Sequence, residues 1–368
     1  MGSDSLPPSK PASEPASAPA RGQGFERDRD PLDARTRIRF AMRDQQIPGP
    51  RGKEMLAGEH RFRVVRNRIF ARPAAESFHE FLVFWLKCTF GDSWHRKHRL
   101  AQPADRHVVM RWILAWHELA LRTLPLDHRA GEVRAAVPTG EVLALLVLAD
   151  DLYRLHLADA LPPDLVVRLR DAGKYQGARY EVAVAAVFVR AGCSVNWTTA
   201  ANHLTCEFTA KFDSGEVVAV EAKSRHREGV LHQRGAAPAD WSADVDNLYR
   251  KAQRKDPDGH PLVVFLDVNR PHEPGAMQVG QKQWHKDIGA MFRSRLRRKP
   301  ENTPESPMAV SLVVVTNWSW HLEGSAHATE GEFLAIEPEW PARRVPARVV
   351  QGELLNALTF YGVLPANE

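Results

Sequence analysis

Residues 204–223 read LTCEFTAKFDSGEVVAVEAK, and this stretch decides the fold because it contains two strand-like segments joined by a short polar turn. The segments, residues 204–212 and 216–223, alternate apolar side chains with period two, which is typical of half-buried strands. Asp-Ser-Gly at positions 213–215 is a sequence that favours a tight turn. We therefore predict an antiparallel hairpin.

The hairpin places charged side chains together. Period-two alternation puts Glu221 and Lys223 on the same face of the second strand, while the intervening apolar residues point to the other face. On the first strand the apolar residues leave Glu207 on the opposite face, so we expect Glu207 to face Glu221 across the hairpin.

A helix is predicted over residues 175–190, and it carries a third carboxylate, Glu181. The next eight residues, 182–189, are all apolar, so this carboxylate is costly to bury without a cation or a hydrogen-bond donor nearby. We predict that Glu181 has such a partner. The alternative is a carboxylate in the first helical turn that is stabilised by the helix dipole.

The following segments complete an α/β order. A helix is predicted over residues 240–255, and two valine-rich runs, 261–268 and 308–316, have the length of buried strands. Three carboxylates and a lysine that converge on one spot suit phosphodiester hydrolysis. Carboxylates hold Mg²⁺, the ion lowers the pKa of a bound water, and a fixed ammonium stabilises charge that develops on the phosphate.

The order of a helical Glu, an acidic strand residue, a turn and a strand ending in Glu-x-Lys is similar to the PD-(D/E)XK nuclease superfamily. The matching residues are Glu181, Glu207 and Glu221-Ala222-Lys223, within a region of about a quarter of the chain. The resemblance implies a restriction-endonuclease-like α/β fold, with a mixed four- to five-stranded sheet flanked by helices. It also implies dependence on Mg²⁺ or Mn²⁺ and the cleavage of DNA or, less often, RNA. It assigns metal binding to Glu207 and Glu221, catalysis to Glu181 and Lys223, and support to Lys251 and Gln253 on the next helix.

This sequence departs from the superfamily pattern at the first strand position. Superfamily members usually have Asp there, often after Pro, whereas this chain has Glu207 after Cys206. The extra methylene moves the carboxylate by about 1 Å or more, which matters for metal geometry. Asp213 is the rival ligand, but it lies in the predicted turn. A Glu-x-Lys motif alone is more often a solvated cross-strand charge pair.

The first half of the chain has a different pattern. Residues 1–32 are rich in Pro, Ser and Ala, which predicts a disordered tail. Residues 33–165 are predicted to form an all-helical module, because apolar residues recur at helical spacing from 75 to 124 and from 141 to 157. Substrate or partner recognition is its expected role, and DNA contact, dimerisation and effector docking fit it equally well. Residues 166–368 form the predicted nuclease-like domain.

Charge and cysteine content bear on the binding partner and on the cellular compartment. The net charge of +5 permits a polyanionic partner without requiring one. Three scattered cysteines and the lack of a long apolar run favour a cytoplasmic protein without a membrane segment. A basic run predicts phosphate contacts, with the charged face of an amphipathic helix as an equal alternative; its residues are Arg293, Arg295, Arg297, Arg298 and Lys299.

The sequence therefore predicts a metal-dependent nuclease that hydrolyses nucleic acid, with DNA preferred. The chain layout suits a restriction or defence role, and a homodimer is expected. The alternative is a catalytically inactive protein with the nuclease fold that acts as a nucleic-acid-binding or regulatory subunit.

Overall fold

The computed structural model describes residues 48–123, 136–199, 204–226, 241–270, 278–296, 302–318 and 332–365. The predicted tail, residues 1–32, lies outside them. The elements of the first half are β1 (Lys53–Ala57), β2 (His60–Val65), β3 (Arg68–Pro73), α2 (Phe78–Phe90), α3 (Asp92–Leu100), η1 (Pro103–Asp105), α4 (Val108–Thr123), α5 (Gly140–Leu157) and α6 (Pro163–Arg170). None of the helices in these ranges combines the length and the apolar content needed to cross a membrane.

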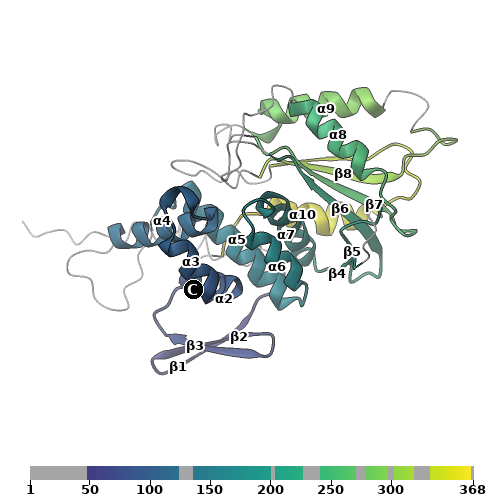
Figure 1. Ribbon diagram of the computed structural model, residues 1–368. Coiled ribbons are helices and arrows are strands. Elements are labelled where there is room, and N and C mark those ends of the chain that lie inside the picture. Colours follow the sequence, from purple (N-terminus) through teal and green to yellow (C-terminus); the bar gives the residue numbers. More distant parts are fainter. Residues whose placement is uncertain are drawn as a thin grey trace, which may run out of the picture.

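The second half contains the larger sheet. Its elements are α7 (Tyr175–Arg190), β4 (Ser194–Trp197), β5 (Phe208–Lys211), β6 (Val217–Ser224), α8 (Trp241–Ala252), β7 (Leu262–Asp267), η2 (Val279–Gln281), α9 (Gln283–Leu296), β8 (Val310–Thr316), β9 (Phe333–Ile336), η3 (Val349–Leu354) and α10 (Leu355–Thr359). Strands β4, β5 and β6 are antiparallel, β6, β7 and β8 are parallel, and β9 returns antiparallel to β8. The predicted α/β class with a mixed sheet flanked by helices is confirmed (Figure 1).

The sheet has six strands in the order β4-β5-β6-β7-β8-β9, instead of the four to five that we expected. The outermost strands, β4 and β9, contain four residues each, which is too short for the sequence to show clear alternation. Edge strands of this length are a common way to end a sheet without an exposed pairing edge.

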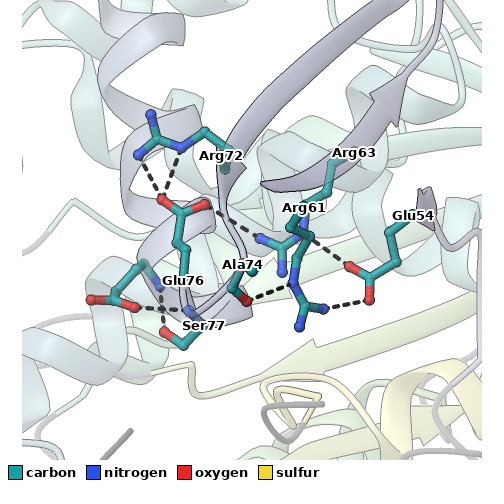
Figure 2. Close-up of polar contacts among 8 residues, drawn as sticks. Glu54, Arg61, Arg63, Arg72, Ala74, Glu76 and Ser77 are labelled. Carbon is teal, nitrogen blue, oxygen red and sulfur yellow. Dashed lines mark hydrogen bonds and ion pairs between the residues drawn. The ribbon is translucent and has the colours of Figure 1, made fainter. Parts of the chain in front are cut away.

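The prediction of an all-helical first half is wrong, because β1, β2 and β3 form an antiparallel sheet. The inward positions of β2 include Arg61 and Arg63, which are buried because Glu54 on β1 pairs with both (Figure 2). Arginines at inward positions conceal the apolar alternation by which a strand is usually predicted. This small sheet lies away from the six-stranded one (Figure 1).

Helix α7 is the centre of the molecule. It is buried on nearly every side, because α5 and α6 pack on it and the six-stranded sheet covers its other side. Its apolar residues belong to one core that extends from α2, α4 and α5 into β5 and β6. This core therefore crosses residue 165, the predicted boundary between the first-half module and the nuclease-like domain. Helices α8 and α9 cover the opposite face of the sheet with a second apolar core (Figure 1).

Candidate functional site

Strands β5 and β6 bring two carboxylates and one ammonium together. The backbone N–H of Glu207 donates to the carbonyl of Val220 at 3.0 Å, which extends the ladder and sets Glu207 opposite Glu221. The Nζ atom of Lys223 lies 2.6 Å from Oε1 of Glu221 and 3.0 Å from Oε1 of Glu207. Lys223 therefore bridges both carboxylates, which come from neighbouring strands.

Glu221 is fully buried, with 0% of its side chain exposed. Burial raises the pKa of its carboxyl group, and the nearby Lys223 ammonium opposes this shift. Its Oε2 atom has no hydrogen-bond partner among the residues that the structure describes. Burial also disfavours the charged form of Lys223, but Glu221 and Glu207 outweigh it and raise the pKa of Lys223. A solvated cross-strand pair is thus excluded for Glu221.

Lys255 is a second cation beside Glu221 that sequence reasoning missed. Its Nζ atom lies 3.4 Å from Oε1 of Glu221 and donates to the carbonyl of Thr205 at 3.0 Å. Helix α8 ends at Ala252, and a backbone bridge between Thr205 and Asp256 then returns the chain to the start of β5. Pairing between such distant segments leaves no local sequence signal.

The two residues predicted to support the site from α8 and the turn after it are Lys251 and Gln253. No hydrogen bond or ion pair within the described ranges joins either of them to Glu207, Glu221 or Lys223. Lys251 is exposed on α8, and Gln253 follows the last residue of the helix. The structure therefore places Lys255 where these two residues were expected.

Glu181 has the partner that its burial requires. Both of its carboxylate oxygens bind the Arg168 guanidinium of α6, at 2.7 and 2.5 Å. Burial raises the pKa of Glu181, and the hydrogen bonds from Arg168 oppose this shift. Because α7 begins at Tyr175, Glu181 lies beyond the first turn, so the helix-dipole alternative is wrong.

Glu181 is linked to the hairpin by charge alone. The charges of Glu207 and Lys223 influence its pKa, but no hydrogen bond or ion pair joins it to either of them in the part of the chain described. Arg168 completes the group, and it was not predicted. The six residues Arg168, Glu181, Glu207, Glu221, Lys223 and Lys255 are called the sheet-edge cluster below.

Asp213, the alternative to Glu207, lies at the turn end of the hairpin, away from Glu221. It is exposed in the turn beyond Lys211, which pairs with Val217. Glu221 lies four residues further along β6, roughly 13 Å away at the usual rise of a strand. Glu207 is therefore the first-strand carboxylate that meets Glu221.

The predicted basic run is only partly described. Arg293 is exposed on α9, whereas Arg295 pairs with Asp246 and its guanidinium lies 4.8 Å from the centre of the Tyr249 ring. Arg295 is thus engaged in the packing between α8 and α9. The remaining members, Arg297, Arg298 and Lys299, lie outside the described residues.

The chemistry of the cluster fits a hard divalent cation held by few protein groups. Among the described residues, no three His, Cys, Asp or Glu side chains are placed to hold a metal together. Mg²⁺ requires only one or two carboxylates, because waters and a substrate phosphate complete its coordination. Glu207 and Glu221, with the unpartnered Oε2 of Glu221, meet that requirement. The cluster does not fit a metal site in which protein side chains supply every ligand.

Comparisons with known protein families, with curated proteins and with solved structures found no match.

Proposed function

We propose that this chain is a metal-dependent nuclease that hydrolyses phosphodiester bonds of nucleic acid, with DNA preferred over RNA. The observation that carries the proposal is the ammonium of Lys223, which two carboxylates from adjacent strands share at 2.6 and 3.0 Å. The side chains of Lys223 and Glu207 are 25% and 26% exposed, so the buried carboxylate of Glu221 lies next to groups that solvent can reach. A substrate phosphate has access there.

Each residue has a distinct role in this proposal. Glu207 and Glu221 would hold Mg²⁺ or Mn²⁺, which when bound would polarise the phosphate and lower the pKa of a bound water. Lys223 stays protonated because two carboxylates raise its pKa, so it offers a fixed positive charge to the phosphate in the transition state. Lys255 would be a second cation beside Oε1 of Glu221, and Arg168 would orient Glu181 through two hydrogen bonds.

The choice of DNA and a restriction or defence setting rest on the resemblance to the PD-(D/E)XK superfamily. The net charge of +5 supports a polyanionic partner. A cytoplasmic setting is proposed from the three cysteines, Cys88, Cys193 and Cys206, all of which are free thiols. A homodimer belongs to the same proposal.

One observation favours a second candidate function. Three cations, Arg168, Lys223 and Lys255, face the three carboxylates of the sheet-edge cluster, so its formal charges balance without a metal. In this second function the cluster would stabilise the fold and would not catalyse hydrolysis. The protein would then act as a nucleic-acid-binding or regulatory subunit.

Cleavage assays separate the two candidates. We expect the purified full chain to nick plasmid DNA in Mg²⁺ or Mn²⁺ and to be inactive in a chelator. Glu221→Ala and Lys223→Ala should each lower the rate by at least about 10²–10³-fold, the loss typical of a group that stabilises transition-state charge. Lys211→Ala, which removes an exposed lysine of β5, is the control and should retain activity. DNA binding without cleavage by the wild type would favour the second candidate.

A further inference from the structure

The chain around helix α3 carries a concentration of positive charge. Residues 92–111, which include α3, η1 and the start of α4, contain five cationic and two acidic side chains: Arg96, Lys97, Arg99, Arg106 and Arg111 against Asp92 and Asp105. Five minus two leaves three positive charges in these 20 residues, within a chain whose net charge is +5. A concentration of one sign of charge attracts a partner of the opposite sign.

The sheet-edge cluster supplies no such net attraction. Its three cations, Arg168, Lys223 and Lys255, face three carboxylates, so its formal charges balance. Proteins that bind nucleic acid gain much of their affinity from lysine and arginine contacts to phosphates. If the cluster cleaves nucleic acid, the cations that hold the substrate must therefore lie elsewhere on the chain.

Three cations of α3 are available to an external acceptor. Arg96, Lys97 and Arg99 are all exposed, and no hydrogen bond or ion pair joins their side chains to another residue of the described ranges. By contrast, Arg295 in the basic run of α9 is already paired with Asp246. The side chains of Arg96, Lys97 and Arg99 are called the α3 basic face below.

The opposite side of α3 fixes the orientation of this face. Trp94 is 9% exposed, its ring centre lies 4.6 Å from that of Phe90, and its Nε1 atom donates to the carbonyl of Arg170 at 3.3 Å. The ring of His98, one turn further along, lies 4.6 Å from the ring of Trp94. A helix with 3.6 residues per turn that is held by Trp94 and His98 presents the α3 basic face to solvent.

Two histidines beside the face indicate a positive local potential. Burial lowers the pKa of His95, and the charges of Lys87 and Arg99 lower it further. Burial also lowers the pKa of His98, and Lys97 acts in the same direction. Charges that disfavour a second cation at this place favour an anion such as phosphate.

Helix α6 connects the α3 basic face to the sheet-edge cluster. Arg170, whose carbonyl accepts from Trp94, also donates from Nη2 to the carbonyl of Thr89 at 2.8 Å. Arg168, two residues earlier on α6, binds Glu181. Two helical residues span about 3 Å along the helix axis. The end of α6 that anchors α3 is thus the same end that reaches the cluster.

We propose that the α3 basic face binds the phosphate backbone of nucleic acid and holds the substrate outside the sheet-edge cluster. This inference assigns nucleic-acid contact to the first half of the chain, in place of dimerisation or effector docking. It rests on the proposed function for the choice of nucleic acid as the polyanion. Contacts to phosphate position a duplex and carry no sequence information, so the affinity gained should not depend on base sequence.

The salt dependence of DNA binding tests the proposal. Fluorescence anisotropy of a labelled DNA duplex, with the full chain in a chelator, measures binding without cleavage. Each phosphate that the protein neutralises adds about 0.9 to the slope of log affinity against log salt concentration. Arg96→Ala/Lys97→Ala/Arg99→Ala should therefore reduce the magnitude of this slope by about two to three, and weaken binding about tenfold or more at physiological salt.

Two further variants locate the contact. Lys53→Ala/Lys286→Ala/Arg343→Ala removes three exposed cations from β1, α9 and the segment after β9, so the net charge changes by the same amount. These three are scattered, and this control should keep most of the wild-type slope. Arg96→Lys/Arg99→Lys retains the positive charges and should bind as the wild type does. Thermal melts verify that each variant is folded.

The proposal is overturned if the α3 triple variant keeps the wild-type slope, or if the scattered control loses as much of it. It is also overturned if the wild type does not bind DNA, whether or not it binds vesicles that contain phosphatidylserine. Nuclease activity is a separate outcome. DNA binding through the α3 basic face without cleavage in Mg²⁺ would contradict the proposed function alone, whereas cleavage with an unchanged slope in the triple variant would contradict this inference alone.

Discussion

Two groups of buried ions differ in their access to solvent. In the helical layer, Asp150 and Asp151 of α5 bind Arg179 and Arg190 of α7, and all four side chains are between 0% and 1% exposed. In the sheet-edge cluster, the same kinds of group meet at Lys223, which is 25% exposed. The chemistry is alike, but only the second group can be reached from outside.

The difference separates a structural role from a chemical one. The helical group is shielded from solvent, and Asp151 also accepts from the Tyr361 hydroxyl at 2.8 Å, so its charges tie α5, α7 and the C-terminal segment together. In the sheet-edge cluster, the carboxylate of Glu221 lies beside Lys223, whose side chain is partly exposed, and its Oε2 atom has no hydrogen-bond partner among the described residues. We infer that the first group stabilises the fold, while the second retains capacity for a ligand.

The largest expected effect is on stability, in the helical group. Arg190→Ala removes a cation that binds both Asp150 and Asp151, and leaves these carboxylates buried with incomplete partners. We expect the free energy of unfolding to fall by about 3–5 kcal/mol, measured by urea denaturation, the cost usual for breaking a buried ion pair. Lys223→Ala is the matched comparison and should cost less, because Lys255 remains 3.4 Å from the Glu221 carboxylate and the Lys223 side chain is 25% exposed. Equal losses in the two variants would remove the distinction.

Asp267 sharpens the comparison, because it is a buried carboxyl group with no cation paired to it in the described parts of the chain. Burial raises its pKa to about 7, although a backbone N–H of Trp318 and the Ser224 hydroxyl donate to it. An unfolded Asp has a pKa of about 3.9, so between roughly pH 4 and pH 7 the folded state binds a proton that the unfolded state lacks. Stability therefore falls as the pH rises through this window.

The slope contributed by Asp267 is at most about 1.4 kcal/mol per pH unit, and it ends above about pH 7. Asp267→Asn resembles the protonated group and lacks this slope, so we expect its unfolding free energy to gain on the wild type as the pH rises from 5 to 7. Urea denaturation of both proteins at several pH values measures the difference. Parallel curves would show that Asp267 is ionised throughout this range in the folded protein.

Local periodicity explains which parts of the structure could be predicted. Helix α7 has the predicted bounds, and the hairpin places Glu207 opposite Glu221, because both features depend on residues close in sequence. Arg168 and Lys255 could not be predicted, since the first binds a residue 13 positions away and the second lies 34 positions after Glu221. Cations far along the chain reach a carboxylate only through tertiary packing.

In the first half of the chain, buried charged side chains likewise made a strand hard to predict from the sequence. Strand β2 was not predicted because Arg61 and Arg63 stand at buried positions where apolar residues are expected. Their burial depends on Glu54, which the turn between β1 and β2 brings opposite. Composition alone cannot distinguish such paired arginines from a solvated surface.

The smallest expected effect distinguishes two lysines at and just after the end of α8, Lys251 and Lys255. Lys255 contacts Glu221, whereas Lys251 is exposed on α8, so Lys255→Ala should lower the cleavage rate about tenfold, the lower end of the range for residues that orient a metal ligand. Lys255 and Mg²⁺ would compete for the carboxylate of Glu221. The loss of Lys255 should therefore also lower the Mg²⁺ concentration that gives half-maximal activity. Titration of activity with Mg²⁺ measures both changes.

Lys251→Ala is the control, and it should alter neither the rate nor the Mg²⁺ dependence. Lys255→Arg keeps the positive charge and should restore most of the rate, which a loss of folding stability would not predict. Because Lys223 remains 2.6 Å from Oε1 of Glu221 in this variant, the unfolding free energy should fall by less than in Arg190→Ala. If Lys251→Ala reduced the rate as much as Lys255→Ala, the position of Lys255 beside Glu221 would have no part in the reaction.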